Sequence, residues 1–257
     1  MCAAPSWLWT AVGRRRHLSK APIQEALVDI QFASSSPLDV SAIASAFAAQ
    51  QRDSVVVDIW ESLFQLKLAP KSQPQSSASG GAVGKRVDFP SLKQVLQFRS
   101  AGFTFSRLPP YGTFEDMEKS MLAAWALVLA RLSAPVLVTR ATLRYINSLT
   151  LPPGSDFSHY LVAGPVVPPG LPQTVSGFLS RISIPCEDCS VNVTQAFTGV
   201  ATDGASPNVL LDIEAAQPLA LDADNTTELR AVLSKLRNFK NDVFFESLTE
   251  LALEMYE

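Results

Sequence analysis

The stretch Val136–Leu149, VLVTRATLRYINSL, decides the fold class of this chain. No glycine or proline interrupts it, and Pro152-Pro153-Gly154 follows it as a stop signal, so we predict one long strand. Because alternate side chains of a strand point to opposite faces, Tyr145 and Asn147 share one face. The other face carries Arg140, Thr142, Arg144 and Ile146.

Further strands and helices are predicted on both sides of this strand. The expected strands are 23–32, 55–68, 95–107 with a turn at Ala101-Gly102, 175–184, 190–197 and 208–214. The expected helices are a short one capped by Asp39 or Ser41, one from Thr113 to Leu132, a short one at 156–161, and a long one from Asn225 or Thr226 to Met255.

This order of elements predicts an α+β fold with a mostly antiparallel sheet and two long helices on one face. The sequence of strand, short helix, several strands and long helix occurs twice. That recurrence suggests two similar β-α-β-β-α units, 20–133 and 134–257, within a single domain 20–257. So many alternating strands argue against a parallel, Rossmann-type sheet.

Two segments differ in composition from the rest of the chain. Residues 1–19 contain no acid and carry the run Arg14-Arg15-Arg16, so we expect a disordered extension or a misassigned start. Residues 70–84 are mostly Ser, Gln, Gly, Ala and Pro, and we expect them to form a flexible loop.

The overall composition excludes several classes of protein. The 257 residues include 21 Lys and Arg against 24 Asp and Glu, so no global charge attracts nucleic acid. No window approaches the roughly 20 apolar residues that a membrane-spanning helix needs. Three cysteines are too few for a disulfide scaffold, and no convincing signal peptide is present, so we expect a cytoplasmic protein.

The residues for metal or redox chemistry are sparse. Cys186 and Cys189 form the only CxxC, and a structural zinc site would need four ligands, for which only Cys2, His17 and His159 remain. A tight turn with two incidental thiols is the simplest interpretation, with zinc binding and dithiol exchange as alternatives. These two cysteines are weak metal candidates, and we predict no cofactor.

No set of residues for catalysis is recognisable. His159 is the one histidine beyond the first 19 residues, no nucleophile-elbow, phosphate-loop or dinucleotide pattern is present, and the chain is not expected to be an enzyme. The two arginines on one face of 136–149 need acids or a ligand opposite. They predict either cross-strand ion pairs, with Asp212 and Glu214 as candidate partners, or a site for an anion or acidic peptide.

Several short motifs occur in a characteristic order. They are Pro22-Ile23-x-Glu25-Ala26, Phe103 through Arg107 leading to Pro110-Tyr111, Arg144-Tyr145-Ile146-Asn147, Asp212-Ile213, and Asn241-x-x-Phe244-Phe245-x-x-x-Thr249. Together they resemble a sporadically distributed family of uncharacterised proteins of bacteria and archaea. The resemblance implies no activity, but the patchy distribution suggests an accessory role, such as in a toxin–antitoxin or defence system.

Three functions follow from these observations as hypotheses. The first is a non-enzymatic interaction or regulatory protein with a protein partner. The second is a small-ligand-binding protein or enzyme with a cavity between sheet and helices, and the third, disfavoured by charge, is a single-strand nucleic-acid binder. The candidate binding residues are Glu25, Arg107, Tyr111, Arg140, Arg144, Tyr145 and Asn147.

Overall fold

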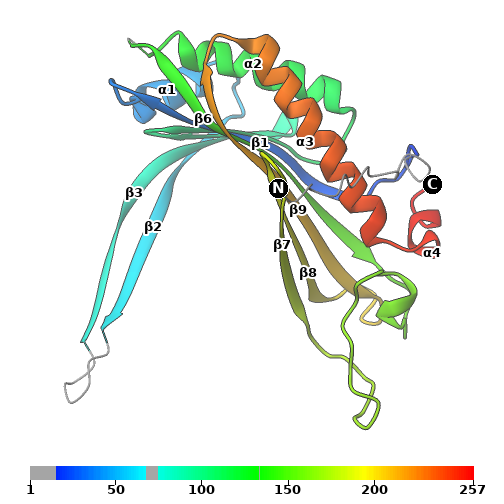
Figure 1. Ribbon diagram of the computed structural model, residues 1–257. Coiled ribbons are helices and arrows are strands. Elements are labelled where there is room, and N and C mark those ends of the chain that lie inside the picture. The colour runs from blue at the N-terminus through cyan, green and yellow to red at the C-terminus, as the bar shows by residue number, and fades with distance from the viewer. Residues whose placement is uncertain (1–15, 68–74, 133) are drawn as a thin grey trace, which may run out of the picture. The chain divides into compact units, whose positions relative to one another are not determined.

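The computed structural model describes residues 16–67, 75–132 and 134–257 (Figure 1). The strands in these ranges are β1 Ile23–Ser34, β2 Val55–Lys67, β3 Gln75–Phe89, β4 Gln94–Arg99, β5 Gly102–Arg107, β6 Val136–Thr150, β7 Leu179–Pro185, β8 Ser190–Val200 and β9 Pro207–Asp222. The helices are α1 Val40–Ala48, α2 Phe114–Leu129, α3 Thr226–Ser247 and α4 Glu250–Glu254, with short 3-10 helices at Pro90–Leu92 and Phe157–His159.

The nine strands form one antiparallel sheet in the order β2-β3-β4-β5-β1-β6-β9-β8-β7. This confirms the predicted α+β class with an antiparallel sheet. The strand pair around Ala101-Gly102 is also confirmed as β4 and β5. A shared face for the two long helices and a repeated β-α-β-β-α unit stay predictions.

The chain divides into two compact units. Unit 1 takes residues up to Ala26 together with Thr142–Gln217 and Ala231–Glu257. Unit 2 takes Leu27–Ala141 and Pro218–Arg230. Each unit therefore draws residues from both sides of position 133.

Unit 2 has an aromatic core. The ring centroid of Phe98 lies 5.1 Å from that of Phe47 and 5.8 Å from that of Phe103. The ring centroid of Trp125 lies 5.8 Å from that of Phe103 and 5.6 Å from that of Phe32. Trp125 comes from α2, which begins where predicted because the Thr113 side chain accepts a hydrogen bond from the Asp116 backbone N–H. The Trp125 indole N–H donates to the carbonyl of Ala223 at 3.2 Å, so its one polar atom is satisfied.

The predicted loop 70–84 is strand from Gln75 onward, and residues 70–74 lie outside the described residues. Lys67 pairs with Gln75, so β2 and β3 continue as a two-stranded ribbon beyond the part of β3 that pairs with β4, 84–89 (Figure 1). Composition misled the prediction because pairing of strands uses backbone N–H and C=O groups, which serine, glycine and alanine also possess.

The predicted C-terminal helix is interrupted near residue 249. Asn225 accepts a hydrogen bond from the Glu228 N–H and begins α3 as expected, but α3 ends at Ser247. Thr249 then donates from its hydroxyl to the carbonyl of His159 at 2.6 Å and from its backbone N–H to the carbonyl of Tyr160. These bonds to the 159–160 segment replace helical ones. The short helix predicted at 156–161 is a 3-10 helix over Phe157–His159.

No helix in the described part of the chain is both long and apolar enough to cross a membrane.

The two tryptophans Trp125 and Trp60 form a matched pair for a test of the unit 2 core. Trp125 is fully buried, whereas Trp60 on β2 is 70% exposed. We expect Trp125→Ala to lower the free energy of unfolding by about 3–5 kcal/mol, and Trp60→Ala to change it by less than about 0.5 kcal/mol. Urea unfolding followed by far-ultraviolet circular dichroism measures both, and similar values for the two variants would contradict the aromatic core.

Candidate functional site

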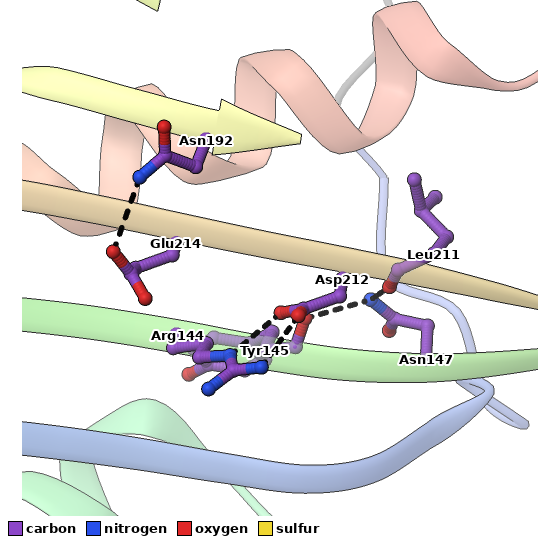
Figure 2. Close-up of polar contacts among 7 residues, drawn as sticks. All are labelled: Arg144, Tyr145, Asn147, Asn192, Leu211, Asp212 and Glu214. Carbon is purple, nitrogen blue, oxygen red and sulfur yellow. Dashed lines mark hydrogen bonds and ion pairs between the residues drawn. The ribbon is translucent and has the colours of Figure 1, made fainter. Parts of the chain in front are cut away.

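Arg144 on β6 and Asp212 on β9 form a bidentate ion pair (Figure 2). The Arg144 Nε donates to Asp212 Oδ1 at 2.8 Å and its Nη2 to Oδ2 at 2.6 Å. The Asp212 side chain is 13% exposed and that of Arg144 is 37% exposed, so the pair is partly withdrawn from water. The cross-strand pairing predicted for Arg144 is confirmed.

Acidic and amide groups extend this contact across the same face of unit 1. Asn192 on β8 donates from Nδ2 to Glu214 Oε1 at 3.2 Å (Figure 2), and Ser183 on β7 donates to Asn192 Oδ1 at 2.6 Å. The hydrogen bonds that Arg144 donates to Asp212, together with the negative charges of Asp212, Glu214 and Glu25, raise the pKa of Arg144. Because acids already surround this guanidinium, the alternative prediction of an anion or acidic-peptide site there has little support.

The opposite face of β6 is buried. Asn147 donates from Nδ2 to the carbonyl of Leu211 at 2.9 Å and to that of Tyr145 at 3.4 Å (Figure 2). Both Asn147 and Tyr145 lie in the core. They are therefore core residues, which argues against their prediction as binding residues: every odd-numbered residue of β6 from Ala141 to Leu149 is buried.

Lys240 on α3 is a buried lysine that the sequence analysis did not identify. Its ammonium lies 3.7 Å from the centre of the Tyr145 ring, and the residue is only 8% exposed. Burial, with a smaller contribution from the charge of Arg237, lowers the pKa of Lys240 to about 7. The sequence pattern could have predicted this burial, because Lys240 lies four residues from Leu236 and from Phe244, within the apolar stripe of the helix.

The remaining candidate residues are half-buried and lie in different places. Glu25 is on β1 in unit 1, close enough to Arg144 to influence its pKa. Arg107, Tyr111 and Arg140 belong to unit 2. Arg107 donates to the carbonyl of Leu92 and to the Ser120 hydroxyl, each at 3.2 Å, so it links β5 to α2.

Cys186 and Cys189 lie in the turn between β7 and β8. The Cys186 N–H donates to the Cys189 carbonyl at 2.8 Å, which confirms the predicted tight turn. Among the residues that the structure describes, no three His, Cys, Asp or Glu side chains are grouped as a metal site would require. Cys2 lies outside those residues.

Exposed apolar side chains gather at the start of β2, here called the β2 stripe: Val55, Val56, Val57 and Trp60, which are 44% to 70% exposed. They pair with positions 88, 87, 86 and 82 of β3, and because successive side chains of a strand point to opposite faces, the β2 stripe occupies both faces of β2. The register shift between Ile59 and Trp60 leaves the extra residue, Val83, on β3, so Trp60 points to the same face of β2 as Val56 and Asp58. α1 places Phe47 against Phe98, which shares its face with Lys85, so α1 covers the face of Val56, and Val55 and Val57 lie on the opposite face.

Sequence reasoning missed this stripe because strong alternation begins only after Trp60. The run of three valines followed by Asp, Ile and Trp was the available signal. Between these residues, Asp58 forms an ion pair with Lys85 of β3 on the face that Val56 and Trp60 share, whereas Glu61 points to the opposite face.

No family model matches this chain, and no curated protein matches it. The resemblance drawn from the short motifs accordingly stays a hypothesis.

The Arg144–Asp212 contact is open to a double-mutant cycle. We expect Arg144→Leu and Asp212→Asn each to destabilise the chain, with a coupling free energy of about 1–3 kcal/mol between them, because each change leaves a partly buried charge unpaired. Urea unfolding of the two single variants and the double variant gives the coupling. Additive effects would show that the pair does not stabilise the fold.

Lys240 predicts a dependence of stability on pH. Since its pKa is about 7 in the folded chain against 10.5 in its ordinary state, the unfolded chain binds the extra proton between these values. The free energy of unfolding therefore rises with pH in this window, by at most about 1.4 kcal/mol per pH unit. Below pH 7 the chain carries the full loss of stability that burial of Lys240 causes.

Lys240→Met tests this dependence while preserving an unbranched side chain. The variant should be more stable than the natural chain at pH 7, and the difference should shrink steadily toward pH 9. Lys235→Met, an exposed position on the same helix, serves as the control. An identical pH dependence of the free energy of unfolding in Lys240→Met and the natural chain would refute the assignment.

Proposed function

We propose that this chain is a non-enzymatic interaction protein that binds a β-strand of a protein partner along β2. The observation that carries the proposal is the β2 stripe, whose Trp60 is 70% exposed. Large exposed apolar groups that lie close together are typical of protein-binding surfaces, and tryptophan is enriched among residues that dominate binding energy.

The position of β2 in the sheet supports addition of a strand. β2 stands first in the strand order, so no other described strand pairs with its outer edge. An edge strand offers a row of backbone donors and acceptors, and natural proteins commonly protect such an edge with charges. β2 carries two acids between residues 55 and 61, and one of them, Asp58, is already ion-paired with Lys85 of β3. A partner strand would gain backbone hydrogen bonds from the edge and specificity from apolar side chains beside Trp60.

The two other hypotheses have less support. Aromatic residues that would line a ligand cavity in unit 2, among them Phe98, Phe103 and Trp125, pack against one another. Arg144, which would hold a nucleic-acid phosphate, is engaged by Asp212 among further acids. The motif resemblance suggests the kind of partner, a toxin or an effector of a defence system.

The test is purification of the tagged full chain from its own host, followed by native mass spectrometry. We expect one stoichiometric protein partner, and we expect Trp60→Ser to weaken its binding by about tenfold or more, because the largest apolar contact is removed.

Leu179→Ser is the matched control. Leu179 is 75% exposed and lies on β7, the other terminal strand of the sheet. It should retain the partner fully. A natural chain that elutes alone, or a Trp60→Ser variant that binds as well as the natural chain, would overturn the proposal.

A further inference from the structure

We propose that Cys186 and Cys189 form a thiol–disulfide exchange site, which reacts with a small-molecule disulfide and closes into an internal disulfide across the β7–β8 turn. This inference is independent of the proposed strand binding. It rests on the relative placement of the two thiols in unit 1.

The backbone places the two cysteines opposite each other. β7 and β8 pair up to Pro185 and Ser190, and the next pair outward is Cys186 and Cys189, joined by the 2.8 Å hydrogen bond from N–H to carbonyl. Residues opposite each other in such a pair have Cα atoms about 5.5 Å apart, inside the range of about 4.4–6.8 Å that disulfides span. Their side chains point to the same face, and the two thiols are in hydrogen-bonding contact.

The two thiols differ in access, which sets the order of reaction. Cys186 is exposed, whereas Cys189 is 8% exposed. The Cys186 thiolate therefore attacks one sulfur of the reagent disulfide, forms a mixed disulfide and releases the first reagent thiolate. The Cys189 thiolate then attacks the Cys186 sulfur and releases the second. Both protons pass to the departing thiolates, so two cysteine thiols are oxidised while one reagent disulfide is reduced to two thiols.

The surroundings of the turn hold the site mainly in its protonated form. Burial and the hydrogen bond with Cys189, with a smaller contribution from the negative charge of Asp188, raise the pKa of Cys186 from 9.0 to about 11. Lys235 acts in the opposite direction, but it is ion-paired with Asp188 in the same turn. Exchange is therefore slow at pH 7, and its rate should still rise about tenfold per pH unit above pH 9, where an ordinary thiol levels off.

The experiment uses the full chain with Cys2→Ser, which leaves Cys186 and Cys189 as the only thiols. The protein is incubated with glutathione disulfide at several pH values, quenched with acid and analysed by intact mass. We expect a species that has lost two hydrogen atoms and carries no adduct, with the steep pH dependence given above.

Two further substitutions separate the roles of the thiols. Adding Cys189→Ser should trap the mixed disulfide on Cys186, and adding Cys186→Ser should slow adduct formation at least tenfold, because Cys189 is shielded. Circular dichroism confirms that each variant is folded. The proposal would be overturned if the two variants formed adducts equally fast and the Cys2→Ser chain formed no internal disulfide. It would also be overturned if the Cys2→Ser chain did not react at any pH up to 10.

Discussion

The register between β6 and β9 is the constraint on which unit 1 depends, and two polar contacts on opposite faces set it. Arg144 meets Asp212 on one face, and Asn147 reaches the carbonyl of Leu211 on the other. A slip of one residue would exchange the two faces, placing the guanidinium in the core and Tyr145 in water. Both contacts would be lost together, so the polar residues specify the register between β6 and β9 more strictly than apolar packing alone would.

This register also brings Tyr145 under α3, where its ring lies against the Lys240 ammonium. Among the described residues no carboxylate forms an ion pair with Lys240, and the ring supplies only part of the stabilisation that water would give. A buried charge without a paired acid is costly, and the pKa of the amine falls in response. In unit 1 the charge of Arg144 on the sheet is thus paired with a carboxylate, whereas the cost of burying the Lys240 ammonium on α3 is only partly offset.

The features proposed to act on other molecules lie away from these cores. The β2 stripe belongs to a ribbon in unit 2, and the two thiols belong to a turn in unit 1. Turns and edge strands can carry such groups because they are less constrained by packing than the strands they adjoin. The candidate residues chosen from the long strand proved in part to be the residues that hold the fold, as the burial of Tyr145 and Asn147 illustrates.

Local patterns in the sequence sufficed for the antiparallel α+β class, for the Thr113 and Asn225 caps, and for Asp212 as a partner of Arg144. Each of these depends on strand alternation, cap chemistry or charge, which nearby residues encode. Only the tertiary structure decided that β3 starts within the serine-rich segment, that the last helix is interrupted at Thr249, and that Lys240 is buried. The reason is physical: backbone pairing across the ribbon, hydrogen bonds from Thr249 to residues 159 and 160, and the packing of α3 over Tyr145 all join segments far apart in sequence.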